Sequence, residues 1–158
     1  MSPAVGTRAP DFRTRNQHGE TLTLSGVLEQ VPADGRLLLV FYPWAFSGIC
    51  TDELAALREG HDRLAAAGVR LLAVSCDAMF TLRAFAEAQE LPFDLLTDHW
   101  PHGAIARAYE VFDDHAGCAL RGSFLLDAEG RVTWSVRHGI GEPRDILAHL
   151  NASVPTRR

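Results

Sequence analysis

The chain has no lysine, and all 15 of its basic residues are arginine. A chain without lysine cannot form a Schiff base through its own side chains, and it cannot supply the phosphate-binding lysine of a P-loop. Acidic residues outnumber basic ones by 20 to 15, which gives a net charge of −5 and a pI of about 5.8. This balance argues against nucleic acid and anionic membranes as partners.

Cysteine is also scarce, with three residues, Cys50, Cys76 and Cys118, that form no short-spaced pair. This spacing excludes a zinc framework and a redox C-x-x-C motif. The odd number of cysteines and the lack of an apolar secretory segment at the N-terminus predict a reducing compartment and a cytoplasmic location. No apolar run approaches the length of a membrane span, so no membrane association is expected.

The length of 158 residues fits one domain, and its hydrophobic pattern predicts a β-α-β unit followed by a hairpin. Strands are predicted at 11–14, 21–24, 37–42, 69–76, 93–96, 123–126 and 131–136, and helices at 50–67, 81–90, 104–109 and from Pro143 onward. The crossover gives parallel strands and the hairpin antiparallel ones. We therefore expect an α/β, thioredoxin-like fold, in which a mixed central sheet carries helices on both faces.

Cys50 has the most informative position in the chain, because it lies at the mouth of the helix at 50–67, after a tight loop at 43–49. The loop follows the carboxyl end of the strand at 37–42, and open α/β sheets place their functional sites at the carboxyl ends of central strands. A thiol there faces unpaired backbone N–H groups and the positive end of the helix dipole, both of which favour the thiolate. The alternative role is that of a small buried apolar residue. The Pro and Ser at fixed offsets before Cys50 favour a chemical role.

Pro43, Ser47 and Cys50 match the signature P-x-x-x-[T/S]-x-x-C, and the chain resembles the peroxiredoxins. Segments 41–54, 100–104 and 121–124 are similar to the alkyl hydroperoxide reductase E subgroup, and the similarity extends over nearly the whole chain. The resemblance implies a single thioredoxin-like peroxiredoxin domain over residues 1–158. It also implies an antioxidant thiol peroxidase that needs neither a metal nor an organic cofactor.

The resemblance assigns a role to each site residue. Cys50 matches the peroxidatic cysteine, Pro43 the loop proline that shields it, and Ser47 the hydroxyl residue beside it. Arg121 matches the guanidinium donor, and Glu53 matches a residue that orients the active-site arginine. Three of them also have a simpler role: Ser47 as a helix cap, Arg121 as a surface charge and Pro43 as the end of a strand. As a set they fit one mechanism.

The expected substrates are hydrogen peroxide and organic hydroperoxides, and the expected reductant is an external thiol. That thiol is either a low-molecular-weight compound or a thioredoxin- or glutaredoxin-like protein. Ala55 and Phe85 occupy positions where related proteins place a resolving cysteine, and Cys76 is expected to be an inert core thiol. We therefore expect a one-cysteine mechanism. The alternatives are resolution by Cys118 and a peroxide-sensing relay that passes oxidation to a partner protein.

The remaining aromatic and histidine residues receive structural roles. A homodimer is expected from the resemblance, with its contact formed by the loops around Trp44 and Trp100. His99 and His102 are read as loop and dimer-contact residues rather than metal ligands. His61 lies on the apolar face of the predicted helix and is expected in the core.

Overall fold

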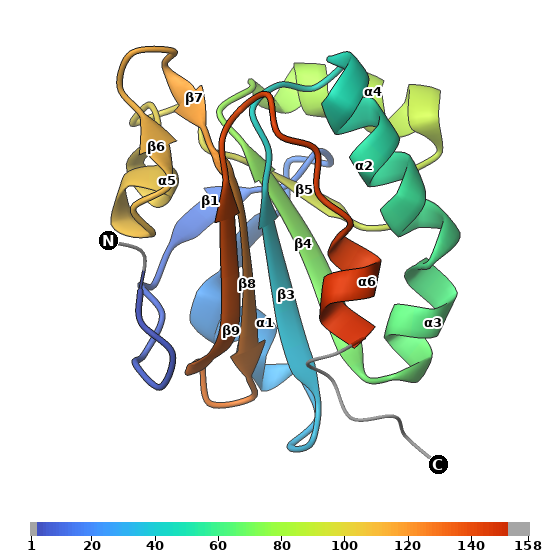
Figure 1. Ribbon diagram of the computed structural model, residues 1–158, viewed down its shortest axis with the longest axis vertical. Coiled ribbons are helices and arrows are strands. Elements are labelled where there is room, and N and C mark those ends of the chain that lie inside the picture. Colours follow the sequence, from blue (N-terminus) through green and yellow to red (C-terminus); the bar gives the residue numbers. More distant parts are fainter. Residues whose placement is uncertain (1–2, 152–158) are drawn as a thin grey trace.

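The computed structural model describes residues 3–151 and has a five-stranded sheet at its centre (Figure 1). The strands are β3 (Arg36–Phe41), β4 (Val69–Ser75), β5 (Asp94–Thr97), β8 (Arg121–Asp127) and β9 (Val132–His138). Their spatial order is β5-β4-β3-β8-β9. Strands β3, β4 and β5 run parallel, whereas β8 is antiparallel to both β3 and β9. The predicted mixed sheet is confirmed.

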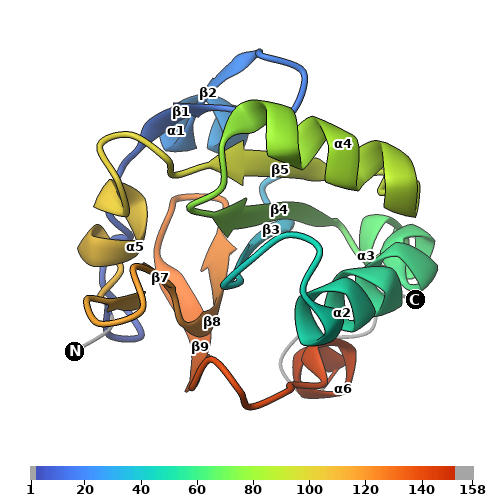
Figure 2. The same ribbon diagram turned by 90° about the horizontal axis from the view of Figure 1, so that it is seen from above.

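Helices cover both faces of this sheet, as predicted (Figure 2). They are α1 (Leu24–Glu29), α2 (Gly48–Glu59), α3 (His61–Ala66), α4 (Met79–Gln89), α5 (Ala104–Ala108) and α6 (Ile146–Asn151). Helices α2, α3, α4 and α6 pack on one face, and α1 and α5 on the other. None of the helices between residues 3 and 151 has the length and apolarity that a bilayer-spanning helix requires.

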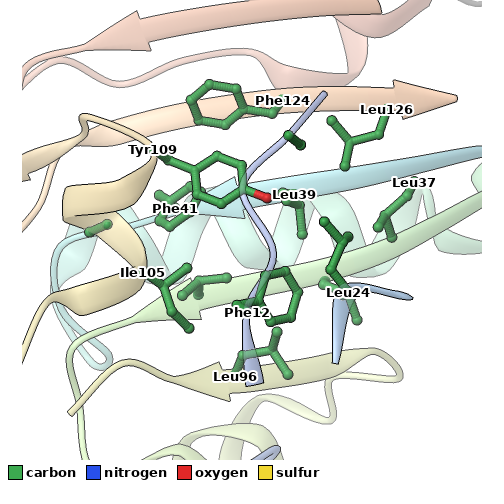
Figure 3. Packing of buried hydrophobic residues seen from close by; sticks show 14 of the residues in the cluster. Phe12, Leu24, Leu37, Leu39, Phe41, Leu96, Ile105, Tyr109, Phe124 and Leu126 are labelled. Atoms are coloured by element: carbon green, nitrogen blue, oxygen red, sulfur yellow. The ribbon is translucent and has the colours of Figure 1, made fainter. Parts of the chain in front are cut away.

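Strand β3 is buried on both faces, because its apolar side chains alternate between two separate cores. Figure 3 shows the core on the α1 and α5 side, where Phe41 meets the rings of Tyr109 and Phe124. The ring centroids lie 5.3 Å and 5.8 Å from that of Phe41. Each fully buried aromatic or aliphatic side chain contributes about 1.5–3 kcal/mol to folding. The strand that leads into Cys50 is therefore firmly fixed.

The predicted helix at 50–67 is wrong in both extent and continuity. Helix α2 begins earlier, at Gly48, so that Cys50 is its third residue, and the helical run breaks at Gly60. A Cβ atom at Gly60 would lie 2.7 Å from a methyl group of Leu147, so a larger residue there would force this side chain of α6 to shift.

The small elements were predicted less well. Strands β1 (Arg13–Arg15) and β2 (Thr21–Thr23) pair antiparallel as expected, with ends shifted by one or two residues. The pair β6 (Phe112–Asp113) and β7 (Cys118–Ala119) and helix α1 were not predicted, because two-residue strands and a six-residue helix carry little periodicity. Pro143 does not begin α6, which starts at Ile146.

Candidate active site

Cys50 follows the loop from β3 to α2 and is completely buried in the core on the α2 side of the sheet. Ser47 is the N-cap residue of α2, with extended backbone, and its carbonyl accepts a hydrogen bond from Thr51 N–H at 2.9 Å. Cys50 lies in the first helical turn and has no exposed surface. Backbone N–H groups in a first turn lack intrahelical acceptors, so those of Ile49 and Cys50 are available to an anion beside the sulfur. Pro43 is buried and offers no N–H group.

Glu53 lies one turn after Cys50 and holds two guanidinium groups. Its Oε1 accepts from Nη1 of Arg121, and its Oε2 accepts from the backbone N–H and from Nε of Arg144, both at 3.1 Å. All three side chains are buried. Residues three apart share one face of a helix, so this cluster lies on the same side of α2 as Cys50. The structure thus brings Arg121 and Arg144, which are distant in the chain, to the helix turn that carries Cys50 and Glu53.

The two arginines are anchored at further points. Nε of Arg121 donates to the carbonyl of Ile140 at 2.7 Å. Nη1 of Arg144 donates to Ser123 Oγ at 3.0 Å, and its Nη2 donates to the carbonyl of Phe41. The second guanidinium therefore joins β3, β8 and α2 in one contact. Arg144 was missed in the sequence, where it read as a first-turn residue of the last helix.

The buried cluster carries one net positive charge, because two guanidinium groups face one carboxylate. Burial lowers the pKa of Arg144 to about 10, and the neighbouring Glu53 opposes that change. Arg144 therefore stays protonated at neutral pH. An unbalanced buried charge is costly, and a thiolate at Cys50, which lies within electrostatic range of Arg144, would balance it.

Ser47 Oγ is buried and makes no hydrogen bond to any residue that the structure describes. It does not cap α2, which was one of the roles considered for it. Buried hydroxyl groups are rarely left without a partner, and a catalytic role or a bound molecule is one explanation of the exceptions. A hydroxyl can both donate and accept, so Ser47 suits a ligand with an O–H group.

Phe46 places backbone strain in the same loop. Its φ is +69°, a left-handed conformation that bulky residues rarely adopt and that costs of order 1–3 kcal/mol. Two contacts hold the loop against this strain. Asp77 Oδ2 accepts from Ala45 N–H at 2.9 Å, and the Phe46 ring meets Phe85 edge to face at 5.0 Å between centroids.

The other two thiols are unlike a catalytic cysteine. Cys76 follows β4, Cys118 lies in β7, and both are free and buried. Burial, with a contribution from Asp98, raises the pKa of Cys76 to about 12. Burial, with a contribution from Asp113, raises the pKa of Cys118 to about 11. Both groups are neutral thiols at physiological pH.

His61, His99 and His102 contact residues outside the Cys50 cluster. His99 and His102 are exposed, with ring centroids 6.2 Å apart, and His102 Nε2 lies 2.7 Å from the carbonyl of Gly117. Among the residues described, no three His, Cys, Asp or Glu side chains are placed to hold a metal ion. The prediction of a core position for His61 is wrong. It is half-buried as the first residue of α3, after the helix break at Gly60, and its ring centroid lies 5.9 Å from that of Phe93.

Comparison with known proteins identifies the class to which this fold and site belong. The model of the AhpC/TSA family matches residues 5–135. Solved structures with the same fold include AhpC of Enterococcus faecalis, with a TM-score of 0.81 and 26% identity over 95% of this chain and 90% of that one. Peroxidoxin BcpB of Mycobacterium tuberculosis gives a TM-score of 0.79 and 25% identity over 96% and 94%. The predicted thioredoxin-like fold is confirmed, and the chain belongs to the AhpC/TSA family.

Within this family the resemblance to one kind of relative is strong. Alkyl hydroperoxide reductase E of Mycobacterium tuberculosis is 39% identical over 141 residues, which cover 89% of this chain and 90% of the relative. Peroxiredoxin 2 of Thermoplasma acidophilum is 30% identical, over 90% of this chain and 70% of its own length. The chain is thus a peroxiredoxin similar to alkyl hydroperoxide reductase E, and its activity is that of a thiol-dependent peroxidase.

Proposed function

We propose that Cys50 is the peroxidatic residue and that it reduces hydrogen peroxide and organic hydroperoxides. The observation that carries this proposal is a fully buried cysteine in a first helical turn, one turn before a carboxylate that holds two buried guanidinium groups. The thiolate attacks one peroxide oxygen, so that an S–O bond forms and the O–O bond breaks. The other oxygen leaves as alkoxide or hydroxide and takes up a proton. Cys50 becomes a sulfenic acid, and the products are an alcohol or water.

Arg121 stabilises both the sulfur and the departing oxygen in this proposal. The two hydrogen bonds to Glu53 and Ile140 use two of its five N–H donors, which leaves others for the reacting atoms. Ser47 Oγ supplies a further partner for the peroxide, and the N–H groups of Ile49 and Cys50 complete the cradle. Such fixed donors around developing charge are commonly the largest single contribution to catalysis. Pro43 shields the sulfur on the side of the loop.

We further propose that an external thiol completes the cycle. One thiol attacks the Cys50 sulfur, releases water and forms a mixed disulfide, and a second thiol displaces Cys50 and leaves as part of a disulfide. A low-molecular-weight thiol and a thioredoxin- or glutaredoxin-like protein both fit this chemistry. The neutral state of the Cys76 and Cys118 thiols supports a one-cysteine cycle, because the thiolate is the attacking form.

The proposed assembly is a homodimer, and the proposed location is the cytoplasm. The dimer is supported by exposed aromatic side chains on the loops that flank the site, with exposed fractions of 39% for Trp44 and 86% for Trp100. The location is supported by the free state of all three thiols. We take the whole chain to act as one peroxiredoxin domain.

Replacement of single cysteines tests the proposed function. Cys50→Ser should abolish peroxide consumption with a dithiol as reductant, because a hydroxyl group is a far weaker nucleophile than a thiolate. Cys76→Ser, the matched control, should retain most of the activity. Turnover that survives in the Cys50 variant would end the assignment of this residue.

A further inference from the structure

We propose that Asp77 is a positioning residue for Cys50. Its carboxylate fastens the loop at residues 43–47 to the end of β4, and it thereby sets how readily the buried sulfur opens to an external thiol. This inference rests on the proposed function of Cys50, and it adds a residue that the sequence pattern around Cys50 does not contain.

Asp77 connects the loop to the sheet through three hydrogen bonds. It lies two residues after the end of β4 and is half-buried. Its Oδ2 accepts from Ala45 N–H at 2.9 Å and from Ser75 Oγ at 2.7 Å. Its backbone carbonyl accepts from Thr97 Oγ1 at 2.6 Å, which ties it to β5 as well. Asp77 is therefore fixed by β4 through its carboxylate and by β5 through its backbone carbonyl, while the carboxylate also binds the loop.

The grip matters because the loop is strained. Phe46, next to Ala45, has its φ at +69°. Its ring contacts that of Phe85, and this apolar contact holds the loop closed together with the hydrogen bond from Ala45 to Asp77. Ser47 adds no side-chain cap to α2. When the loop opens, Phe46 can relax to an ordinary φ, so strain favours opening and the Asp77 bond opposes it. Such a segment has two arrangements whose populations one hydrogen bond can shift.

The shift bears on the catalytic cycle because Cys50 has no exposed surface. A bulky thiol cannot reach the sulfur while the loop is closed, whereas the closed loop holds the donors that the peroxide needs. Loss of the Asp77 carboxylate should therefore slow the reaction with peroxide and speed the reaction with thiols. A residue that merely stabilises the fold would not move these two rates in opposite directions.

The test compares Asp77→Ala with Asp77→Asn. The alanine variant should lower the second-order rate constant with hydrogen peroxide by about tenfold. It should also raise, by about tenfold, both iodoacetamide alkylation of reduced Cys50 and dithiothreitol reduction of oxidised Cys50, read by peptide mass spectrometry. The asparagine variant keeps an oxygen that can accept both bonds, so all three rates should stay within about threefold of the parent.

Asp127→Ala is the matched control. Asp127 also holds a turn, since its Oδ1 accepts from the N–H groups of Glu129 and Arg131 at 3.0 Å, but it lies at the opposite end of the sheet. Loss of the Asp127 carboxylate should lower the unfolding midpoint. It should not lower the rate with peroxide while raising the rates of alkylation and of reduction by thiols. If Asp77→Ala fails to fold, Asp77→Glu, which keeps the charge but moves the carboxylate by one methylene, should show the opposed changes in smaller measure.

Three outcomes would overturn the proposal. They are unchanged rates in Asp77→Ala, rates that move in the same direction, or an asparagine variant that behaves like the alanine variant, which would make the charge rather than the hydrogen bonds responsible. The proposed function is judged separately, by the parent protein beside Cys50→Ser. A parent that consumes peroxide through Cys50 with no effect at Asp77 would refute only the present inference.

Discussion

At the scale of single residues, Glu53 organises the site. One carboxylate fixes Arg121 at one oxygen and Arg144 at the other, so both guanidinium groups are set relative to the helix that carries Cys50. Buried charges of this kind are stabilising only when every partner is present. The resemblance at the level of sequence led to Glu53 and Arg121, whose roles stay predictions. It did not lead to Arg144, because no local pattern distinguishes a buried arginine before a helix from an exposed one.

We predict that Arg121→Lys keeps the positive charge but loses most of the peroxide rate. A lysine ammonium is a point charge and cannot donate from a rigid fork to Glu53, sulfur and peroxide together. The expected loss is at least about tenfold in the second-order rate constant, measured by stopped-flow fluorescence. Arg137→Lys, at an exposed position of β9, is the control. A lysine variant as fast as the parent would show that charge alone suffices.

We predict that Arg144→Met lowers the free energy of unfolding by about 1–3 kcal/mol, because Ser123 Oγ and the Phe41 carbonyl lose their donor and Glu53 Oε2 keeps only the backbone N–H of residue 144. The change should appear as a lower midpoint in urea unfolding. Arg137→Met removes an exposed arginine and should change the midpoint little. Equal midpoints for the two variants would contradict a structural role for the Arg144–Glu53 contact.

The buried thiols of Cys76 and Cys118 predict a loss of stability in alkali. Their pKa values of about 12 and 11 lie above the value of about 8.5 expected in the unfolded chain. The contribution is complete below the unfolded value and is lost as pH rises towards the folded values, because the unfolded chain then binds fewer protons. Between pH 9 and pH 10 each thiol should lower the unfolding free energy by at most about 1.4 kcal/mol. The double variant Cys76→Ala, Cys118→Ala should flatten this slope in urea titrations, and an unchanged slope would refute the assignment.

At the scale of elements, the strands were predictable and the irregular joints were not. The six apolar or aromatic residues in a row at 37–42 predict β3, and both faces of this strand are buried. The break at Gly60 lies where Leu147 of α6 approaches the chain, and the local sequence pattern reveals neither this break nor the start of α2 at Gly48. The β6–β7 pair was invisible because its order comes from cross-contacts rather than from periodicity. Local pattern therefore fixes where an element lies better than where it ends.

The β6–β7 pair is held tightly to α5. The Arg107 guanidinium lies over the Phe112 ring at 4.0 Å and pairs with Asp114 at 2.7 Å, while His102 contacts the carbonyl of Gly117. A Cβ atom at Gly103 would lie 2.3 Å from Phe112, so the two segments are in close packing. These contacts hold the strand pair that carries Cys118 in a fixed position against α5.

Because the β6–β7 pair is held in this way, we predict that Cys118 does not resolve the Cys50 sulfenic acid. Movement of Cys118 towards Cys50 would also displace Arg121, three residues on, whose fixed position the chemistry needs. After one equivalent of peroxide, non-reducing mass spectrometry should find sulfenic acid that persists until a thiol is added. A Cys50–Cys118 disulfide at near-full yield, within one chain or between two, would overturn the one-cysteine cycle and leave the peroxidase itself intact.

At the scale of the whole molecule, large exposed aromatic side chains lie beyond the carboxyl ends of the parallel strands. Trp44 follows β3, Phe80 lies in the first turn of α4 after β4, and Trp100 follows β5. The carboxyl ends of parallel strands lie at the same end of a sheet, and β3, β4 and β5 are neighbours in this sheet (Figure 2). The exposed fractions of the three aromatic side chains are 39%, 70% and 86%. Exposed apolar surface of this kind usually marks an interaction site.

We predict that this end of the sheet, with its three exposed aromatic side chains, forms the contact of a homodimer. Light scattering of the parent at micromolar concentration should give twice the 17.3 kDa of one chain. Trp100→Glu should shift the mass towards the monomer, because two such carboxylates would be buried without partners across a two-fold axis. Val5→Glu changes an apolar residue that is 63% exposed but far along the chain from these loops, and it should leave the mass unchanged. A monomer mass for the parent in both the reduced and the oxidised state would refute the dimer, and a dimer that withstands Trp100→Glu would move its contact to another face.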